Sequence, residues 1–106
     1  MLIPTEAEER VRDLVQCRST FQREILKSRH YVLKFLARRG LFYREGTPLR
    51  QPHYEWLRRL ARADSVLATE DRNVFDEYLA LLEYKLSRRD ELDRQIAALA
   101  LTRAVA

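Results

Sequence analysis

Two histidines, one cysteine and four serines are among the side chains of this sequence that could act as bases, nucleophiles or metal ligands. Neither His30 nor His53 has Cys, Asp or Glu at the spacings that metal sites use, and no identifiable base accompanies any serine. Gly40 and Gly46 do not form a phosphate-binding loop. We therefore predict no catalytic residue, no metal site, no cofactor and no small-molecule substrate. Cys17 is expected to be a buried or half-buried thiol without reactivity.

Arginine supplies 17 of the 20 basic residues, and the 16 acidic residues leave a formal net charge of +4. The charge is unevenly distributed along the chain. Residues 10–62 contain 14 basic and 4 acidic side chains, whereas residues 63–106 contain 6 basic and 9 acidic ones. Because the guanidinium group donates paired hydrogen bonds to phosphate oxygens, the basic half predicts a DNA or RNA partner.

Aromatic residues accompany these arginines, a combination that is typical of proteins that bind RNA or single strands. The rings are those of Tyr31, Phe42, Tyr43, His53, Tyr54 and Trp56. The candidate nucleic-acid contacts, chosen by local charge and motif position, are Arg12, Arg18, Arg29, Lys34, Arg38, Arg39, Arg44, Arg50, His53, Arg58 and Arg59. The alternative is a solvated helix surface, because the basic residues scatter around a heptad wheel and do not form one stripe.

Three helices must position these side chains. Pro4-Thr5 followed by Glu8 is a capping box that starts a helix over about residues 6–39, which Gly40 ends. Helical spacing of apolar residues predicts a short helix over about 53–63, and a last helix covers about 70–103. Two long helices joined by a compact crossover predict an all-α, coiled-coil-like antiparallel hairpin. We expect residues 1–106 to form a single helical domain.

Apolar residues at heptad spacing form the expected core seam and dimer seam of the long helices. The candidate seam residues are Val11, Leu14, Phe21, Ile25, Trp56, Phe75, Leu82 and Ile96. The densest apolar content lies where the long helices are joined, which predicts a three-helix core there. The remaining two-helix part buries little, so a partner helix or a homodimer is expected.

The sequence excludes two further classes of protein. A single cysteine rules out a disulfide framework. The longest apolar run, residues 96–101, is far shorter than the roughly 20 residues that span a bilayer. Residues 1–20 lack the order of a signal peptide. A cytoplasmic protein without a membrane partner is therefore predicted.

Short motifs in a fixed order resemble one family of bacterial transposases. They are Arg12-Asp13-Leu14-Val15 with Arg18, Ser28-Arg29, Leu33-Lys34-Phe35-Leu36, Arg39-Gly40 with Tyr43, His53-x-x-Trp56-Leu57 and Phe75-x-Glu77-Tyr78-Leu79. The family is the DEDD-type insertion-sequence transposases, which join a RuvC-like nuclease domain to a serine-bearing domain and are guided by a bridge RNA. The resemblance runs through residues 5–100 and covers only the helical middle segment of such a protein. Family members have a Trp-Thr pair where this chain has Leu49-Arg50.

The resemblance implies that the catalytic residues of such a transposase lie outside this segment. Its expected role is then binding of DNA or guide RNA and dimer assembly in DNA transposition and recombination, in a bacterial cytoplasm. The chain would be a truncated or degenerate transposase, and no enzyme by itself. Two alternatives remain open: a helical oligomerisation or adaptor protein that binds no nucleic acid, and an inert relic.

Overall fold

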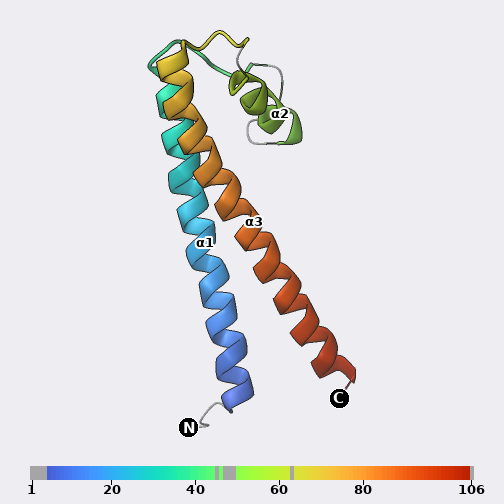
Figure 1. The fold of residues 1–106 in the computed structure, drawn as a ribbon. Coiled ribbons are helices and arrows are strands. Elements are labelled where there is room, and N and C mark those ends of the chain that lie inside the picture. Colours follow the sequence, from blue (N-terminus) through green and yellow to red (C-terminus); the bar gives the residue numbers. More distant parts are fainter. Residues whose placement is uncertain (1–4, 45, 47–49, 63, 106) are drawn as a thin grey trace. The chain divides into compact units, whose positions relative to one another are not determined.

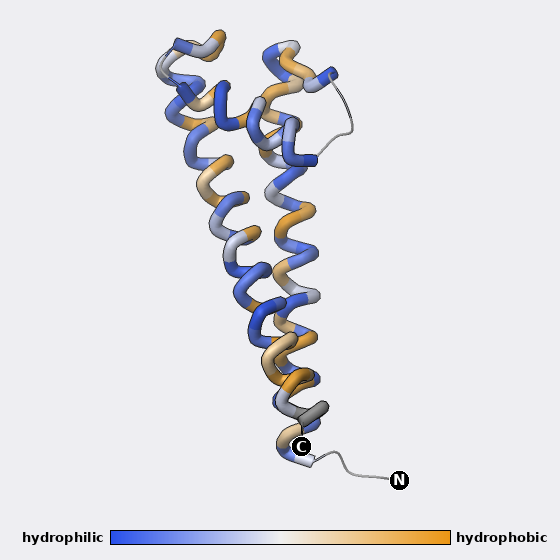
Figure 2. Tube along the Cα trace, turned by 90° about the vertical axis from the view of Figure 1, so that its right-hand side faces the viewer, coloured by the Kyte–Doolittle hydropathy of each residue, from blue (hydrophilic) through white to orange (hydrophobic). Residues whose placement is uncertain are grey.

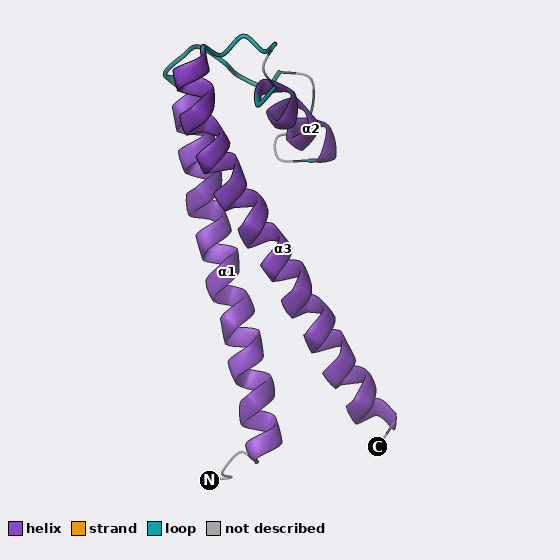
Figure 3. Cartoon of the chain, in the orientation of Figure 1, coloured by secondary structure: helices purple, strands orange, loops and turns teal. Residues whose placement is uncertain are grey.

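The computed structural model describes residues 5–44, 46, 50–62 and 64–105. Its secondary structure consists of three helices (Figures 1 and 3): α1 spans Glu6–Ala37, α2 spans Gln51–Leu60 and α3 spans Thr69–Val105. No strand occurs in these described ranges. The prediction of an all-α fold with a short helix in the crossover is confirmed.

The two ends of α1 follow from the residues found there. The backbone amide of Glu8 donates to Thr5 Oγ1 at 3.2 Å, which is the Thr5 half of the predicted capping box. At the other end, Gly40 has a φ of +71°, and the amides of Leu41 and Gly40 donate to the carbonyls of Leu36 and Ala37. This is a Schellman motif, which satisfies the last carbonyls of a helix. The helix therefore ends two residues before the predicted position 39.

Helix α2 begins at Gln51, two residues earlier than predicted, because Pro52 falls in its first turn. Proline is compatible with that turn, where backbone amides have no partner within the helix. The helix ends at Leu60. The amides of Ala61 and Arg62 then donate to carbonyls only three residues back, as in a 3₁₀ turn. The predicted end, position 63, lies outside the described residues.

Helix α3 begins at Thr69, one residue before the prediction, and ends at Val105, two residues after it. Glu70 and Asp71 occupy its first turn, where the helix dipole favours negative charge. No Gly or Pro interrupts its 37 residues. Along both long helices, hydrophobic residues recur among hydrophilic ones (Figure 2), as expected for helices that bury one face.

The chain divides into two compact units. The terminal unit comprises residues 1–26 and 83–106, and the central unit comprises residues 27–82. Each unit therefore contains part of α1 and part of α3, and the central unit also contains α2. The expectation of a single domain over residues 1–106 stays a prediction.

In the terminal unit, polar side chains join α1 to α3 in antiparallel order. Arg18 forms an ion pair with Asp93, Gln22 accepts a hydrogen bond from Arg89, and Glu24 pairs with Lys85. Residue numbers rise along α1 while those of the α3 partners fall. The buried apolar side chains are Ile25 and Leu92, and the predicted seam residues Val11, Leu14, Phe21 and Ile96 are partly buried.

In the central unit, the same antiparallel order joins the two long helices through aromatic rings. The ring of Tyr31 lies 6.0 Å from that of Tyr78, and the ring of Phe35 lies 6.2 Å from that of Phe75. The buried apolar side chains are Val32, Leu36, Leu57, Leu60, Leu67, Phe75, Leu79 and Leu82. This confirms the expected three-helix core, since α1, α2 and α3 all contribute to it.

Candidate nucleic-acid interface

The central unit carries the strongest basic stretch of the chain. Residues 27–62 contain ten basic and two acidic side chains, a net charge of +8. Four of the predicted contacts there are exposed, and their side chains form no hydrogen bond or ion pair with another described residue: Lys34, Arg38, Arg50 and Arg59. An exposed cation without a carboxylate partner can give up its water to a phosphate without first breaking an ion pair.

Arg39, another predicted contact, is instead held by three groups of the central unit. Its Nη2 lies 2.8 Å from Asp71 Oδ1, its Nη1 donates to the carbonyl of Phe35 at 2.9 Å, and its guanidinium carbon lies 3.7 Å from the Phe35 ring centroid. The hydrogen bond from Arg39 holds the pKa of Asp71 below its ordinary value. Arg39 therefore links α1 to α3.

Other predicted contacts are also engaged within the fold. Arg18 forms an ion pair with Asp93 in the terminal unit, and this bond lowers the pKa of the Asp93 carboxyl. The Nε of Arg29 donates to the Tyr54 hydroxyl at 3.2 Å, which joins α1 to α2. Among the remaining candidates, Arg12, Arg44 and Arg58 are exposed.

His53 is buried, and the structure does not support its predicted contact with nucleic acid. Its ring is 2% exposed, lies parallel to that of Tyr43 with centroids 4.5 Å apart, and is tilted against Trp56. Burial lowers the pKa of His53, which favours the neutral ring. Its position on the inner face of α2 explains the difference, because that face also carries the buried side chains of Leu57 and Leu60.

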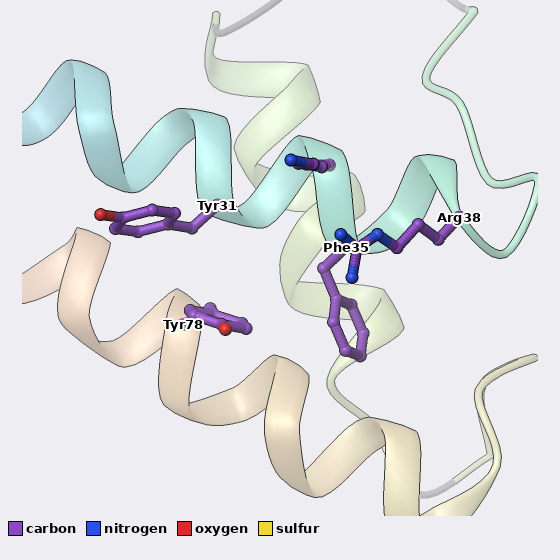
Figure 4. Close-up of a pocket in the computed structure, with 5 residues that line it drawn as sticks. Tyr31, Phe35, Arg38 and Tyr78 are labelled. Carbon is purple, nitrogen blue, oxygen red and sulfur yellow. The ribbon is translucent and has the colours of Figure 1, made fainter.

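Two of the exposed cations line a cavity with three aromatic rings (Figure 4). This cavity, called here the tyrosine cavity, has a volume of about 200 Å³ and is lined by Tyr31, Lys34, Phe35, Arg38 and Tyr78. Tyr31, Lys34 and Phe35 of α1 and Arg38, directly after its end, are spaced i, i+3, i+4 and i+7, which places them on one side of the helix. The Arg38 side chain runs back along α1 toward Phe35 (Figure 4), the usual direction for long side chains on a helix.

Sequence reasoning did not identify the tyrosine cavity. The spacing of Tyr31, Lys34, Phe35 and Arg38 is a signal that could have found its α1 side. Tyr78 belongs to the Phe75-x-Glu77-Tyr78-Leu79 motif, and its role in the cavity depends on which part of α1 faces it. The ring of Tyr78 lies 5.9 Å from that of Phe35 and is half-buried.

Two further cavities lie in the central unit. The larger, about 460 Å³, is mostly apolar and is lined by His30, Leu33, Lys34, Ala37, Leu41, Phe42, Tyr43, His53 and Trp56. The other, about 290 Å³, brings Arg59 and Arg62 close to Asp64. Lys34 therefore borders two cavities, and Arg59 borders the third.

The described residues contain no group of His, Cys, Asp and Glu side chains that could hold a metal ion. None of the helices, as far as they are described, is long and apolar enough to cross a membrane. Cys17 is exposed, so the expectation of a buried or half-buried thiol was wrong. The residue lies one position before Arg18 on α1, outside the heptad seam that faces α3.

Comparison of the chain with protein family models, curated proteins and solved structures finds no match. The resemblance to insertion-sequence transposases therefore stays a prediction.

Proposed function

We propose that this chain binds DNA or RNA through the central unit and acts as the non-catalytic helical segment of a bacterial insertion-sequence transposase. The observation that supports nucleic-acid binding is the set of exposed cations without partners among the described residues: Lys34, Arg38, Arg50 and Arg59. They belong to a stretch with a net charge of +8. Neutralising phosphates with such groups releases condensed counterions and drives binding.

The terminal unit does not favour the same role. Five of its eight described cationic side chains face carboxylates: Arg18 pairs with Asp93, Lys85 with Glu24, and Arg94 Nη2 lies 2.7 Å from Glu91 Oε2, with Arg10 and Arg89 paired to acidic neighbours on their own helices. A phosphate would have to compete with these carboxylates for the same donors. We therefore assign phosphate contact to the central unit.

Salt dependence tests this assignment. The logarithm of the association constant for labelled RNA and DNA should fall linearly with the logarithm of salt concentration. For each phosphate neutralised, the slope should be about 0.7–0.9 log units per tenfold increase in salt. Arg50→Gln with Arg59→Gln should make the slope shallower by about 1.4–1.8, because each residue contributes about 0.7–0.9. The control Arg88→Gln with Arg94→Gln removes the same charge from the terminal unit and should leave the slope unchanged. Absence of binding at about 50 mM salt, or equal effects of both double variants, would contradict the assignment.

Dimer assembly is the second part of the proposal, and the terminal unit supports it. Among the described residues, this unit contains two of the ten buried apolar side chains, Ile25 and Leu92. Val15 and Leu26 of α1 are 45% and 51% exposed. They are eleven residues apart, which is three helical turns, so they lie on one face. A second copy of the chain could cover that face.

Sedimentation equilibrium tests the dimer. Val15→Glu with Leu26→Glu should yield a monomer, because the pair replaces the two exposed apolar side chains of the proposed contact with like charges. The control Gln16→Glu with Thr20→Glu adds the same charge at exposed polar positions of the same helix. A wild-type monomer would exclude the dimer. A dimer without affinity for nucleic acid at any salt concentration would identify the alternative, an oligomerisation or adaptor protein.

The transposase assignment has its own test in the flanking DNA. Coding sequence for a RuvC-like nuclease domain upstream and a serine-bearing domain downstream would support it. Flanking DNA without traces of either domain would contradict it and leave the binding proposal to stand on its own.

A further inference from the structure

The tyrosine cavity combines features that duplex DNA alone would not require. We propose that it takes an unpaired base of a single-stranded nucleic acid, with the base stacked on Tyr31 and the neighbouring phosphates bound by Lys34 and Arg38. This inference rests on the proposed function and adds to it the kind of strand that is bound. RNA and DNA single strands share the chemistry that it requires.

The exposed ring of Tyr31 provides the stacking surface. Tyr31 is 48% exposed, whereas Phe75 of the same unit is fully buried. The ring of Tyr31 also lies near that of Tyr78, with ring centroids 6.0 Å apart and ring planes 36° apart. Tyr78 in turn contacts Phe35 at 5.9 Å. The stacking ring is therefore backed by two further rings that fix its place.

Only an unpaired base can use such a surface. In a duplex, neighbouring base pairs cover both faces of each base, whereas bases of single strands can be splayed out and stacked on aromatic side chains. Every base has a flat π-face, so the contact tolerates any sequence. Stacking contributes about 1–3 kcal/mol per base, which corresponds to roughly a five-fold or larger factor in affinity.

Lys34 and Arg38 supply the phosphate contacts of the same cavity. They follow Tyr31 by three and seven residues, so both cations lie on the face of α1 that carries the ring. Both are exposed, and neither side chain has a hydrogen-bond or ion-pair partner within the described part of the chain. Figure 4 shows the Arg38 side chain directed back toward Phe35, so its guanidinium group lies at the cavity. Ring and cations together match the groups that a strand presents, namely a base face and its flanking phosphates.

Fluorescence anisotropy with three probes tests the inference: a uridine homopolymer, a deoxythymidine homopolymer of equal length and a duplex of that length. Tyr31→Leu should lower the ratio of single-strand to duplex affinity by roughly five-fold or more, since it removes the stacking ring. Tyr84→Leu, at an exposed tyrosine of the terminal unit, is the matched control and should leave the ratio unchanged. The two wild-type single-strand affinities identify RNA or DNA as the preferred strand.

The cations give a separate readout. Lys34→Gln with Arg38→Gln should weaken binding of all three probes and make the single-strand salt slope shallower by about 1.4. If this double variant weakens binding while Tyr31→Leu leaves the ratio unchanged, base stacking is excluded and the proposed function stands. If the wild type binds no probe at about 50 mM salt, the proposed function fails, and the stacking proposal with it.

Photochemical cross-linking locates the base directly. Single strands that contain 5-iodouracil form adducts with aromatic side chains on which the base is stacked. Adducts at Tyr31 or Tyr78 are expected. Adducts confined to rings elsewhere, such as Phe42, would overturn the assignment to this cavity.

Discussion

The terminal and central units are built from the same two long helices but use their charged side chains differently. In the terminal unit, cations of one helix face carboxylates of the other, as Arg18 does with Asp93 and Lys85 with Glu24. In the central unit, the side chains of Lys34 and Arg38 lie beside aromatic rings and form no hydrogen bond or ion pair with another described residue. Paired charges hold helices in register, whereas exposed unpaired charges are available to a ligand.

The two units also differ in how much apolar surface they bury. Of the ten buried apolar side chains in the described part of the chain, eight belong to the central unit, to which α2 contributes, and two belong to the terminal unit. A larger core can hold exposed rings and cations in place without help from ion pairs. The difference is consistent with our proposal that the central unit binds nucleic acid and that the terminal unit assembles with a second copy of the chain.

Truncation of Phe75 should have the largest effect on stability. Its side chain is 0% exposed in the core of the central unit, so Phe75→Ala should lower the free energy of unfolding by about 3–5 kcal/mol. Phe21→Ala, at a half-buried position of the terminal unit, should cost less, about 1–2 kcal/mol. Urea unfolding followed by circular dichroism at one fixed protein concentration measures both losses. Equal losses would show that the cores of the two units are equally important.

The helices and the central core could be predicted because they depend on local patterns. The capping box at Thr5 and the Gly40 stop set the ends of α1 to within two residues. Apolar spacing around Phe75 and Leu82 predicted burial, and both side chains are 0% exposed. Pro52 was misleading, because proline breaks a helix interior but fits the first turn of α2.

For the candidate contacts, the sequence could predict which residues are charged but not which of them are paired within the fold. Arg18 and Asp93 are 75 positions apart in sequence, so their pairing depends on the register of two helices that local patterns do not set. The same holds for Arg39 with Asp71, and for the burial of His53 beneath Tyr43. Sequence shows which residues are basic, and packing decides which of them remain available.

Acidification should destabilise the central unit through His53. Burial lowers the pKa of this side chain below its ordinary value of 6.5, so the unfolded chain binds more protons than the folded chain in that range. Stability is therefore fully present above pH 6.5 and falls as the pH drops below it toward the lowered pKa. The free energy of unfolding should be smaller at about pH 5.5 than at about pH 7.5, by less than the loss expected for Phe75→Ala.

Two histidine variants test whether His53 is the source of this pH dependence. His53→Leu should abolish the difference between the two pH values, whatever its effect on stability at either one. His30→Gln, at an exposed position of α1, should retain the difference. The carboxyls of Asp71, Glu91 and Asp93 do not interfere, because arginine partners lower their pKa values further below this window. A pH dependence that survives in His53→Leu would remove His53 as its source.

The ion pair between Lys85 and Glu24 should have the smallest effect and decides how the terminal unit is held together. Lys85 Nζ lies 3.3 Å from the Glu24 carbonyl and 3.4 Å from its Oε2, and the two side chains are 13% and 41% exposed. A double-mutant cycle with Glu24→Gln and Lys85→Met should give a coupling of about 0.2–1 kcal/mol, because partial exposure leaves the pair screened by water and salt. The coupling should shrink at high salt. A salt-insensitive coupling well above about 1 kcal/mol would mean that charge pairing, and not a second copy of the chain, compensates for the small apolar core of this unit.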